Sequence, residues 1–251
     1  MLNGSPARAH RARRALALLV PGVSLVRDAA AGARGGGRPR GRILDCGCGT
    51  GSNLAMLAPF GDVSGFDLTW RGLSFARERS GGRIAQASIG AIPFRSSTFE
   101  LVTSFDVFQC LPEEVERAAA SEMARILKPG GAAVFNFAAL EMLRGAHSVL
   151  AEEVRRYSRD RVVTLLEGAG LRVERLTFTF TSVFPLMLAA RVGHRWRRPG
   201  GEAEVGEWEI TVPSAPVNGL LTAAVAAEAV ALRAVNMPIG SSLLCLARKP
   251  R

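Results

Sequence analysis

The chain has 251 residues, 48% of them hydrophobic, so it can bury one sizeable core and is not intrinsically disordered. The formal net charge of +10 rests almost wholly on arginine, because lysine occurs only at Lys128 and Lys249. A GC-rich genome produces the same bias, so charge alone does not favour a nucleic-acid partner. The four cysteines lack the spacing of a zinc site or a disulfide framework, which predicts no metal and a cytoplasmic location.

The N-terminal region, residues 1–41, is strongly basic and precedes the main domain expected at 42–251. Residues 1–42 hold nine arginines against one acid, Asp28. We expect an amphipathic helix at roughly 8–20 and a flexible linker over 32–41. A secretory signal peptide is the less favoured alternative, because Pro21 and Gly22 interrupt its apolar run. No stretch reaches the ~18 apolar residues of a membrane span.

Residues 43–53 carry the most informative pattern. The run D-x-G-x-G-x-G begins at Asp45, after two apolar residues, and a helix-like segment follows at 53–58. A buried strand that breaks into a glycine-rich turn and then a helix builds a nucleotide-binding loop at the strand's carboxyl end. The sixth position of G-x-G-x-x-G is Ser52 rather than Gly or Ala, which argues against a dinucleotide-binding site.

A second acid, Asp67, ends a short strand expected over 62–67. It lies 16 positions beyond Gly51, about where doubly wound folds place the carboxylate that binds a ribose diol. A carboxylate suits this task because it can accept hydrogen bonds from both hydroxyls. The alternative is that Asp67 caps the N-terminus of a helix expected over 69–79.

The rest of the chain alternates strands with helices. We expect strands at 83–88, 97–104, 132–137, 171–179 and 241–247, helices after Pro112, at 158–168 and at 217–235, an apolar segment at 183–192, and a surface loop at 194–206. The helix after Pro112 should end at Lys128-Pro-Gly-Gly131, because Pro and Gly cannot continue it. The alternation predicts the α/β class, with parallel strands in a doubly wound sheet.

Three motifs together resemble class I S-adenosyl-L-methionine (SAM) dependent methyltransferases, of a bacterial, methyltransferase type 11-like kind. They are the D-x-G-x-G-x-G run, the Leu127-Lys-Pro-Gly-Gly131 turn, and Ile92-Pro-Phe94 before Phe99-Glu-Leu-Val102. The resemblance covers roughly residues 40–250. It implies a Rossmann-like seven-stranded sheet, mostly parallel with an antiparallel last strand, and SAM as cofactor. It also implies a cofactor half over 42–137 and an acceptor or cover half over 138–251.

The resemblance further implies a set of cofactor-binding residues. It places Asp45, Gly47, Gly49 and Gly51 at the methionine end of SAM, Asp67 at the ribose, Ser88 and Ile89 at the adenine, and Asp106 after the fourth strand. The family usually has an Asp for the adenine amino group, and a serine hydroxyl accepts that hydrogen bond more weakly. The family's Glu-His after Asp106 is replaced by Gln109-Cys110. Either the chemistry needs no base there, or the enzyme is impaired.

These features predict methyl transfer to a small-molecule or lipid-like acceptor by in-line displacement, in which the protein aligns the acceptor with the methyl carbon. A hydroxyl acceptor would need a base, and His147, after the fifth strand, is the candidate. A solvated loop histidine is the alternative. Tyr157 is the candidate for lining the acceptor pocket, and packing against the sheet is its alternative.

Two other functions stay open. An RNA or protein methyltransferase could use the Arg-rich N-terminus, although the Asn/Asp-Pro-Pro-aromatic motif of amino-group chemistry on bases is absent after the fourth strand. A non-catalytic SAM-binding protein is suggested by Ser88 and Gln109-Cys110. The apolar segment at 178–192 and the Ala-rich helix at 217–235 could line a pocket, make a peripheral membrane contact, or pack in the core.

Overall fold

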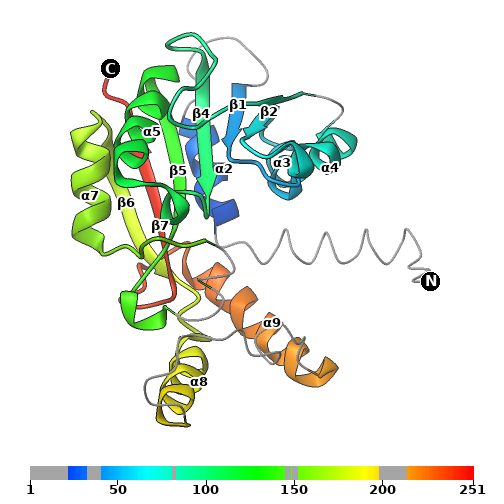
Figure 1. The fold of residues 1–251 in the computed structure, drawn as a ribbon, viewed down its shortest axis with the longest axis vertical. Coiled ribbons are helices and arrows are strands. Elements are labelled where there is room, and N and C mark those ends of the chain that lie inside the picture. Colours follow the sequence, from blue (N-terminus) through cyan, green and yellow to red (C-terminus); the bar gives the residue numbers. More distant parts are fainter. Residues whose placement is uncertain (1–21, 33–40, 81–82, 145–147, 149–151, 198–213) are drawn as a thin grey trace.

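The computed structural model describes residues 22–32, 41–80, 83–144, 148, 152–197 and 214–251. These residues form one seven-stranded sheet with helices on both faces (Figure 1). The helix expected at 8–20 and most of the linker expected at 32–41 lie outside the described residues.

The sheet has the strand order β3-β2-β1-β4-β5-β7-β6. Its strands are β1 (Gly41–Cys46), β2 (Gly61–Asp67), β3 (Ile84–Gln86), β4 (Phe99–Phe105), β5 (Leu127–Ala138), β6 (Arg172–Thr179) and β7 (Ser242–Arg248). Neighbours among β1 to β5 pair in parallel, whereas β7 runs antiparallel to both β5 and β6. The predicted Rossmann-like sheet, mostly parallel with an antiparallel last strand, is confirmed.

Helices cover both faces because successive side chains of a strand point to opposite sides of the sheet. Leu44 and Phe135 belong to one core, and their neighbours Ile43 and Val134 belong to the other. Helices α5 and α7 cover the first core, and α2 and α3 cover the second. The helices are α2 (Gly22–Gly32), α3 (Ser52–Leu57), α4 (Trp70–Ser80), α5 (Glu113–Ile126), α7 (Arg159–Gly168), α8 (Phe184–Arg197) and α9 (Ala215–Ala231), with short 3-10 turns η1 (Phe108–Cys110) and η2 (Glu141–Leu143).

Helix α2 is the main difference from the expected N-terminal region. The helix expected before Pro21 stays a prediction, and the structure adds α2, which begins directly after this residue. Proline ends a helix that precedes it, yet it is well tolerated where a helix starts. Leu25, Val26 and Ala29 are at most 2% exposed and join the core formed by β1, β4, β5 and β7. Part of the N-terminal region is therefore a layer of the fold itself.

Two further boundaries also differ from expectation. Lys128-Pro-Gly-Gly131 lies inside β5 rather than before it, at a shift in register opposite Phe99 and Leu101. Gly130 has a φ of +75°, a backbone conformation that residues with a side chain rarely adopt. The turn is therefore an irregularity within the strand rather than a break before it. The prediction of a surface loop at 194–206 is wrong for residues 194–197, because α8 continues through His194 to Arg197.

Helices α8 and α9 form a projection, here called the α8–α9 lobe, beyond one edge of the sheet (Figure 1). The lobe is inserted between β6 and β7, which pair at Thr179 and Ser242 next to the carboxyl end of β5. Glu228 of α9 is 5% exposed and accepts hydrogen bonds from the backbone N–H groups of Thr181 (3.1 Å) and Ser182 (2.8 Å). Among the described residues, every helix is too short or too polar to span a bilayer.

We predict that Leu25→Ala lowers the free energy of unfolding by about 3 kcal/mol, because it leaves a cavity between α2 and the sheet. Leu25 is 2% exposed, whereas Leu220 on α9 is 71% exposed and gives a matched control. Leu220→Ala should change stability by less than about 0.5 kcal/mol. Urea unfolding of the full chain measures both values, and equal effects of the two substitutions would contradict the packing of α2.

Candidate functional site

The glycine-rich turn after β1 is fixed against β2. The backbone N–H groups of Gly47 and Cys48 both donate to the carbonyl oxygen of Phe66 at 2.9 Å. Gly47 has φ of +77°, and a Cβ atom there would lie 2.4 Å from Val107 Cγ2. A Cβ atom on Gly49, in contrast, would have no neighbour within 4 Å. The turn is thus closely packed on one side and open above Gly49, as a loop that receives a ligand on its backbone requires.

Gly51 completes the turn where α3 approaches α4. A Cβ atom on Gly51 would lie 2.8 Å from the backbone Cα of Ala76. Only glycine fits this distance, so the spacing of the third glycine is explained by contact between two helices.

Asp45 is a buried acid with an incomplete set of hydrogen bonds. Its side chain is 0% exposed, and Oδ1 accepts a hydrogen bond from Thr103 Oγ1 at 2.7 Å. Oδ2 has no hydrogen-bond partner in the described part of the chain. Burial raises the pKa of Asp45 to about 7, against the smaller lowering effects of the Thr103 and Asn53 side chains. A buried oxygen without a donor fits a site whose ligand brings one, and a cationic ligand would also stabilise the ionised acid.

Asp67 connects the glycine-rich turn to the start of α4. Its Oδ2 accepts from the N–H of Gly49 at 2.8 Å, and its Oδ1 accepts from the N–H and hydroxyl of Thr69 at 2.9 and 2.7 Å. The contact with Thr69 resembles the capping role considered as the alternative. Each carboxylate oxygen has two lone pairs, so these three bonds leave one lone pair, on Oδ2, for a hydroxyl donor from a ribose. The ribose role of Asp67 remains a prediction.

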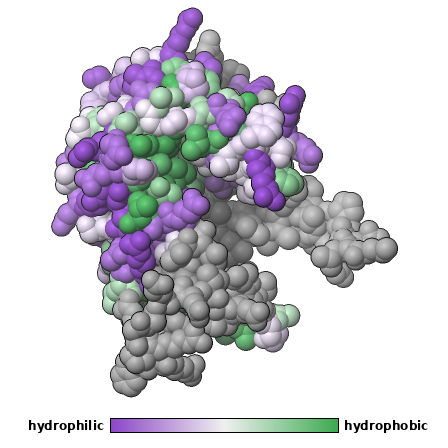
Figure 2. Space-filling view, in the orientation of Figure 1, coloured by the Kyte–Doolittle hydropathy of each residue, from purple (hydrophilic) through white to green (hydrophobic). Residues whose placement is uncertain are grey.

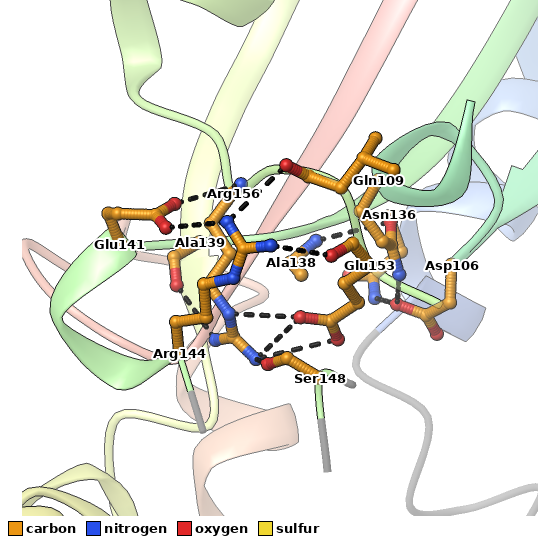
Figure 3. Close-up of polar contacts among 11 residues, drawn as sticks. Asp106, Gln109, Asn136, Ala138, Ala139, Glu141, Arg144, Ser148, Glu153 and Arg156 are labelled. Atoms are coloured by element: carbon orange, nitrogen blue, oxygen red, sulfur yellow. Dashed lines mark hydrogen bonds and ion pairs between the residues drawn. The ribbon is translucent and has the colours of Figure 1, made fainter. Parts of the chain in front are cut away.

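Asp106 stands where β4 ends, and two amide side chains hold it (Figure 3). Its Oδ1 accepts from Nδ2 of Asn136 at 2.8 Å and from Nε2 of Gln109 at 3.4 Å. Its φ of +58° is strained for a residue with a side chain, and its N–H donates to the carbonyl oxygen of Asn136 at 3.1 Å. Desolvation by the surrounding protein raises the pKa of Asp106, although the side chain keeps contact with solvent. Together these contacts fix the carboxylate at the edge where β4 and β5 end.

A buried ion pair, also drawn in Figure 3, holds the segment after β5 in place. The side chains of Arg156 and Glu153 are 9% and 6% exposed and lie 3.0 Å apart. Arg156 also donates to the carbonyl oxygen of Ala139 at 3.1 Å, and Arg144 donates to that of Glu153 at 3.1 Å. The N–H of Val154 donates to the carbonyl oxygen of Gln109 at 2.8 Å. These bonds bring residues 152–157 over the end of β5, beside Asp106.

The two residues expected at the adenine differ in their surroundings. Ser88 is exposed, and its Oγ accepts from the N–H of Gly90 at 3.2 Å. Ile89 is 7% exposed, and its side chain packs in the core. Only the backbone of Ile89 could then meet a ligand. Contact of either residue with adenine remains a prediction.

Of the two residues expected on the acceptor side, the structure describes Tyr157 and does not describe His147. Tyr157 is 1% exposed, its ring packs against Phe137, and its hydroxyl reaches Glu116 and the carbonyl oxygen of Phe108. Burial raises the pKa of Tyr157 further above its usual value. This position favours packing against the sheet over lining a pocket, because the hydroxyl is already occupied inside the core. His147 lies outside the described residues.

Sequence reasoning missed the residues that organise this edge, namely Asn136, Glu153 and Arg156. A signal for Asn136 was available, because it interrupts the apolar run of 132–137 just before the strand ends. Polar residues at the carboxyl ends of parallel strands point to a site in this fold class. The pairing of Glu153 with Arg156 has no comparable signal, since it depends on how residues 138–157 fold back.

Comparisons with known proteins agree with this geometry. Residues 43–131 match the family model described as methyltransferase domain. Malonyl-[acyl-carrier protein] O-methyltransferase of Enterobacter lignolyticus (strain SCF1) is 33% identical over 157 residues, 59% of this chain and 61% of that protein. The chain thus spans about three fifths of the length of this curated relative.

Two solved structures share the fold. A Bacillus halodurans protein assigned as a methyltransferase has a TM-score of 0.57 at 21% identity, covering 91% of this chain and 99% of its own. The [4+2]-cyclase SpnF has a TM-score of 0.55 at 19% identity, covering 91% and 81%. At these identities the likeness shows the fold alone, and the reaction must be argued from the site. The family match over residues 43–131, the strand order and the turn after β1 agree that this part of the chain resembles a SAM-dependent methyltransferase domain.

Proposed function

We propose that the protein transfers the methyl group of SAM, by in-line displacement, to the carboxylate oxygen of a small-molecule or lipid-like acid. SAM when bound supplies an electrophilic methyl group on a sulfonium cation. The observation that carries the proposal is Gln109-Cys110 in place of the family's Glu-His. An acceptor that is already ionised at neutral pH needs no base, so this site could act on it unaided.

Neither residue at that position is suited to take a proton. The amide of Gln109 is not basic, and its side chain is 4% exposed, with Oε1 3.5 Å from the N–H of Ala138. Burial raises the pKa of the Cys110 thiol, so the thiol stays protonated at neutral pH. A hydroxyl acceptor would therefore lack help from either group, whereas a carboxylate would not require it.

The geometry described above supports a role for each of several residues in binding the cofactor. The open space above Gly49 receives the ligand along the backbone, and the remaining lone pair of Asp67 Oδ2 accepts from a ribose hydroxyl. The uncompensated Oδ2 of Asp45 beneath the turn and the carboxylate of Asp106 beside it favour the cationic amino-acid end. These roles position the reacting groups, which is the main task of the protein in a displacement of this kind.

The edge beside Asp106 is apolar enough for a lipid-like acceptor. Val107, Leu111 and Leu140 are partly buried there, and Met142 and Val154 are 50% and 47% exposed. Figure 2 shows a hydrophobic area around the carboxyl half of β4, framed by hydrophilic residues. The curated relative adds support, because its name specifies an oxygen acceptor and a malonyl group, which bears a carboxylate.

The proposal is tested with methyl-labelled SAM and separate host fractions of acidic small molecules, acidic lipids, RNA and protein. We expect label in base-labile methyl esters of the acidic fractions, and none from Asp67→Ala, whose SAM affinity should fall at least tenfold. Label in RNA, or base-stable label in protein, would overturn the proposal, whereas base-labile label on a carrier-bound acid would agree with it. SAM binding without transfer to any fraction would instead favour the non-catalytic alternative.

We predict that Asp45→Asn stabilises the ligand-free protein at pH 8 while weakening SAM binding. The pKa of Asp45 is raised from 3.8 to about 7, so folded protein holds the proton more tightly than unfolded chain. The contribution of Asp45 to the free energy of unfolding is therefore greatest below pH 4. It falls as the pH rises to about 7, by at most about 4 kcal/mol. The asparagine removes this loss. Urea unfolding at pH 5 and pH 8 measures it, and an unchanged pH dependence in Asp45→Asn would contradict the prediction.

We also predict that Cys110→Ala keeps kcat within about twofold, because no proton passes to this position. A general base contributes about 100-fold or more to the rate, so its loss would be plain. The measurement is kcat on the accepted acid between pH 7 and 9, with saturating SAM. A loss of two orders of magnitude, with a folded protein by circular dichroism, would assign the base to Cys110 and contradict a carboxylate acceptor.

A further inference from the structure

The sheet has a charged hollow at the edge opposite the glycine-rich turn, where β5 and β6 begin and β7 ends. The hollow has a volume of about 490 Å³ and is lined by Gly130, Arg172, Glu174, Arg248, Lys249, Pro250 and Arg251. Because β7 is antiparallel to β5, its end lies beside the start of β5, whereas the glycine-rich turn follows the carboxyl end of β1. In Figure 1 the C-terminus marks this edge, at the end of the sheet opposite the α8–α9 lobe.

The hollow, here called the amino-edge hollow, carries an excess of positive charge. Four cations line it against one acid, Glu174. Glu174 Oε1 accepts from Arg248 Nε at 2.8 Å and from Arg172 Nη2 at 3.0 Å, and this pair of arginines lowers the pKa of the acid. One carboxylate thus holds two guanidinium groups together and cannot neutralise both.

The remaining cations lack an acid partner in the described part of the chain. Lys249 Nζ donates to the backbone carbonyl oxygens of Leu127 at 2.9 Å and Arg125 at 3.4 Å. Burial and the nearby Arg125 guanidinium lower the pKa of Lys249. Arg251 is exposed and lies beside Gly130. An anion in the hollow would relieve this repulsion.

The arginines also keep donors available. Of the three guanidinium nitrogens of each, Arg172 uses one in these contacts, and Arg248 uses two, the second on the carbonyl oxygen of Gly130 at 3.0 Å. Guanidinium groups match the oxygens of a phosphate, and a phosphate can carry two negative charges. The volume is in the range of small-molecule sites.

We propose that the amino-edge hollow binds the phosphate group of a small phosphorylated molecule, through Arg172, Arg248, Lys249 and Arg251. The site is separate from the cofactor turn, so the proposal does not depend on the methyl acceptor. Arg172 and Arg251 are exposed and are the positions to change, because Arg248 also holds the strand ends together.

The test is calorimetric titration of the full chain with inorganic phosphate and with glycerol 3-phosphate, at constant ionic strength set by sodium chloride. We expect saturable binding of one phosphate group per chain, weakened at least fivefold in Arg172→Ala/Arg251→Ala. Arg117→Ala on α5, whose side chain is 70% exposed, removes a charge elsewhere and should leave binding unchanged. Tighter binding of glycerol 3-phosphate would show that the rest of the molecule is also recognised, and equal binding would assign recognition to the phosphate alone.

Three results would overturn the proposal. Phosphate that binds no better than chloride would show ordinary screening of surface charge. Equal weakening by Arg117→Ala would show an effect of net charge rather than of a site. Binding of an RNA oligonucleotide without binding of either phosphate compound would make this edge a nucleic-acid surface instead.

Discussion

The contact on which the site depends is the attachment of the glycine-rich turn to β2. Two N–H groups of the turn share the carbonyl oxygen of Phe66, and a third, that of Gly49, reaches the carboxylate of Asp67 at 2.8 Å. Because β1 and β2 are parallel neighbours, their carboxyl ends meet at one edge, and the turn and the acid come together there. The acid at the end of β2 therefore shapes the loop in addition to any part it takes in binding ribose.

A second constraint is electrostatic. Asp45 lies buried under this turn with a raised pKa, so the ligand-free protein holds an acid that is costly to ionise. The exposed side chain of Asp106 lies beside it. A cationic ligand changes that balance, which explains why a protein of net charge +10 keeps carboxylates at this edge. A cluster of positively charged side chains lies at the opposite edge, around Glu174. The two ends of one sheet thus present opposite chemistry.

Much of the fold and the cofactor side could be predicted because their signals are local. Glycines at alternate positions, an acid at the end of a strand, and alternating strands and helices each follow from residues close together in sequence. Helix α2 was missed because Pro21 ends one possible helix as readily as it precedes another. Tyr157 shows the opposite difficulty. A lone tyrosine after a strand suits a pocket or a core equally, and its contact with Glu116, 41 positions away in sequence, decides for the core.

The sequence by itself determined the class of fold, the position of the cofactor turn and the absence of the family's Glu-His pair, since each depends on residue type and spacing alone. Only the tertiary structure decided what the replacement residues do. Gln109 supports Asp106 together with Asn136, and the Arg156–Glu153 pair places residues 152–157 beside them. Such contacts join segments that are separated along the chain, and their partners are selected by the packing of the whole sheet rather than by any local pattern.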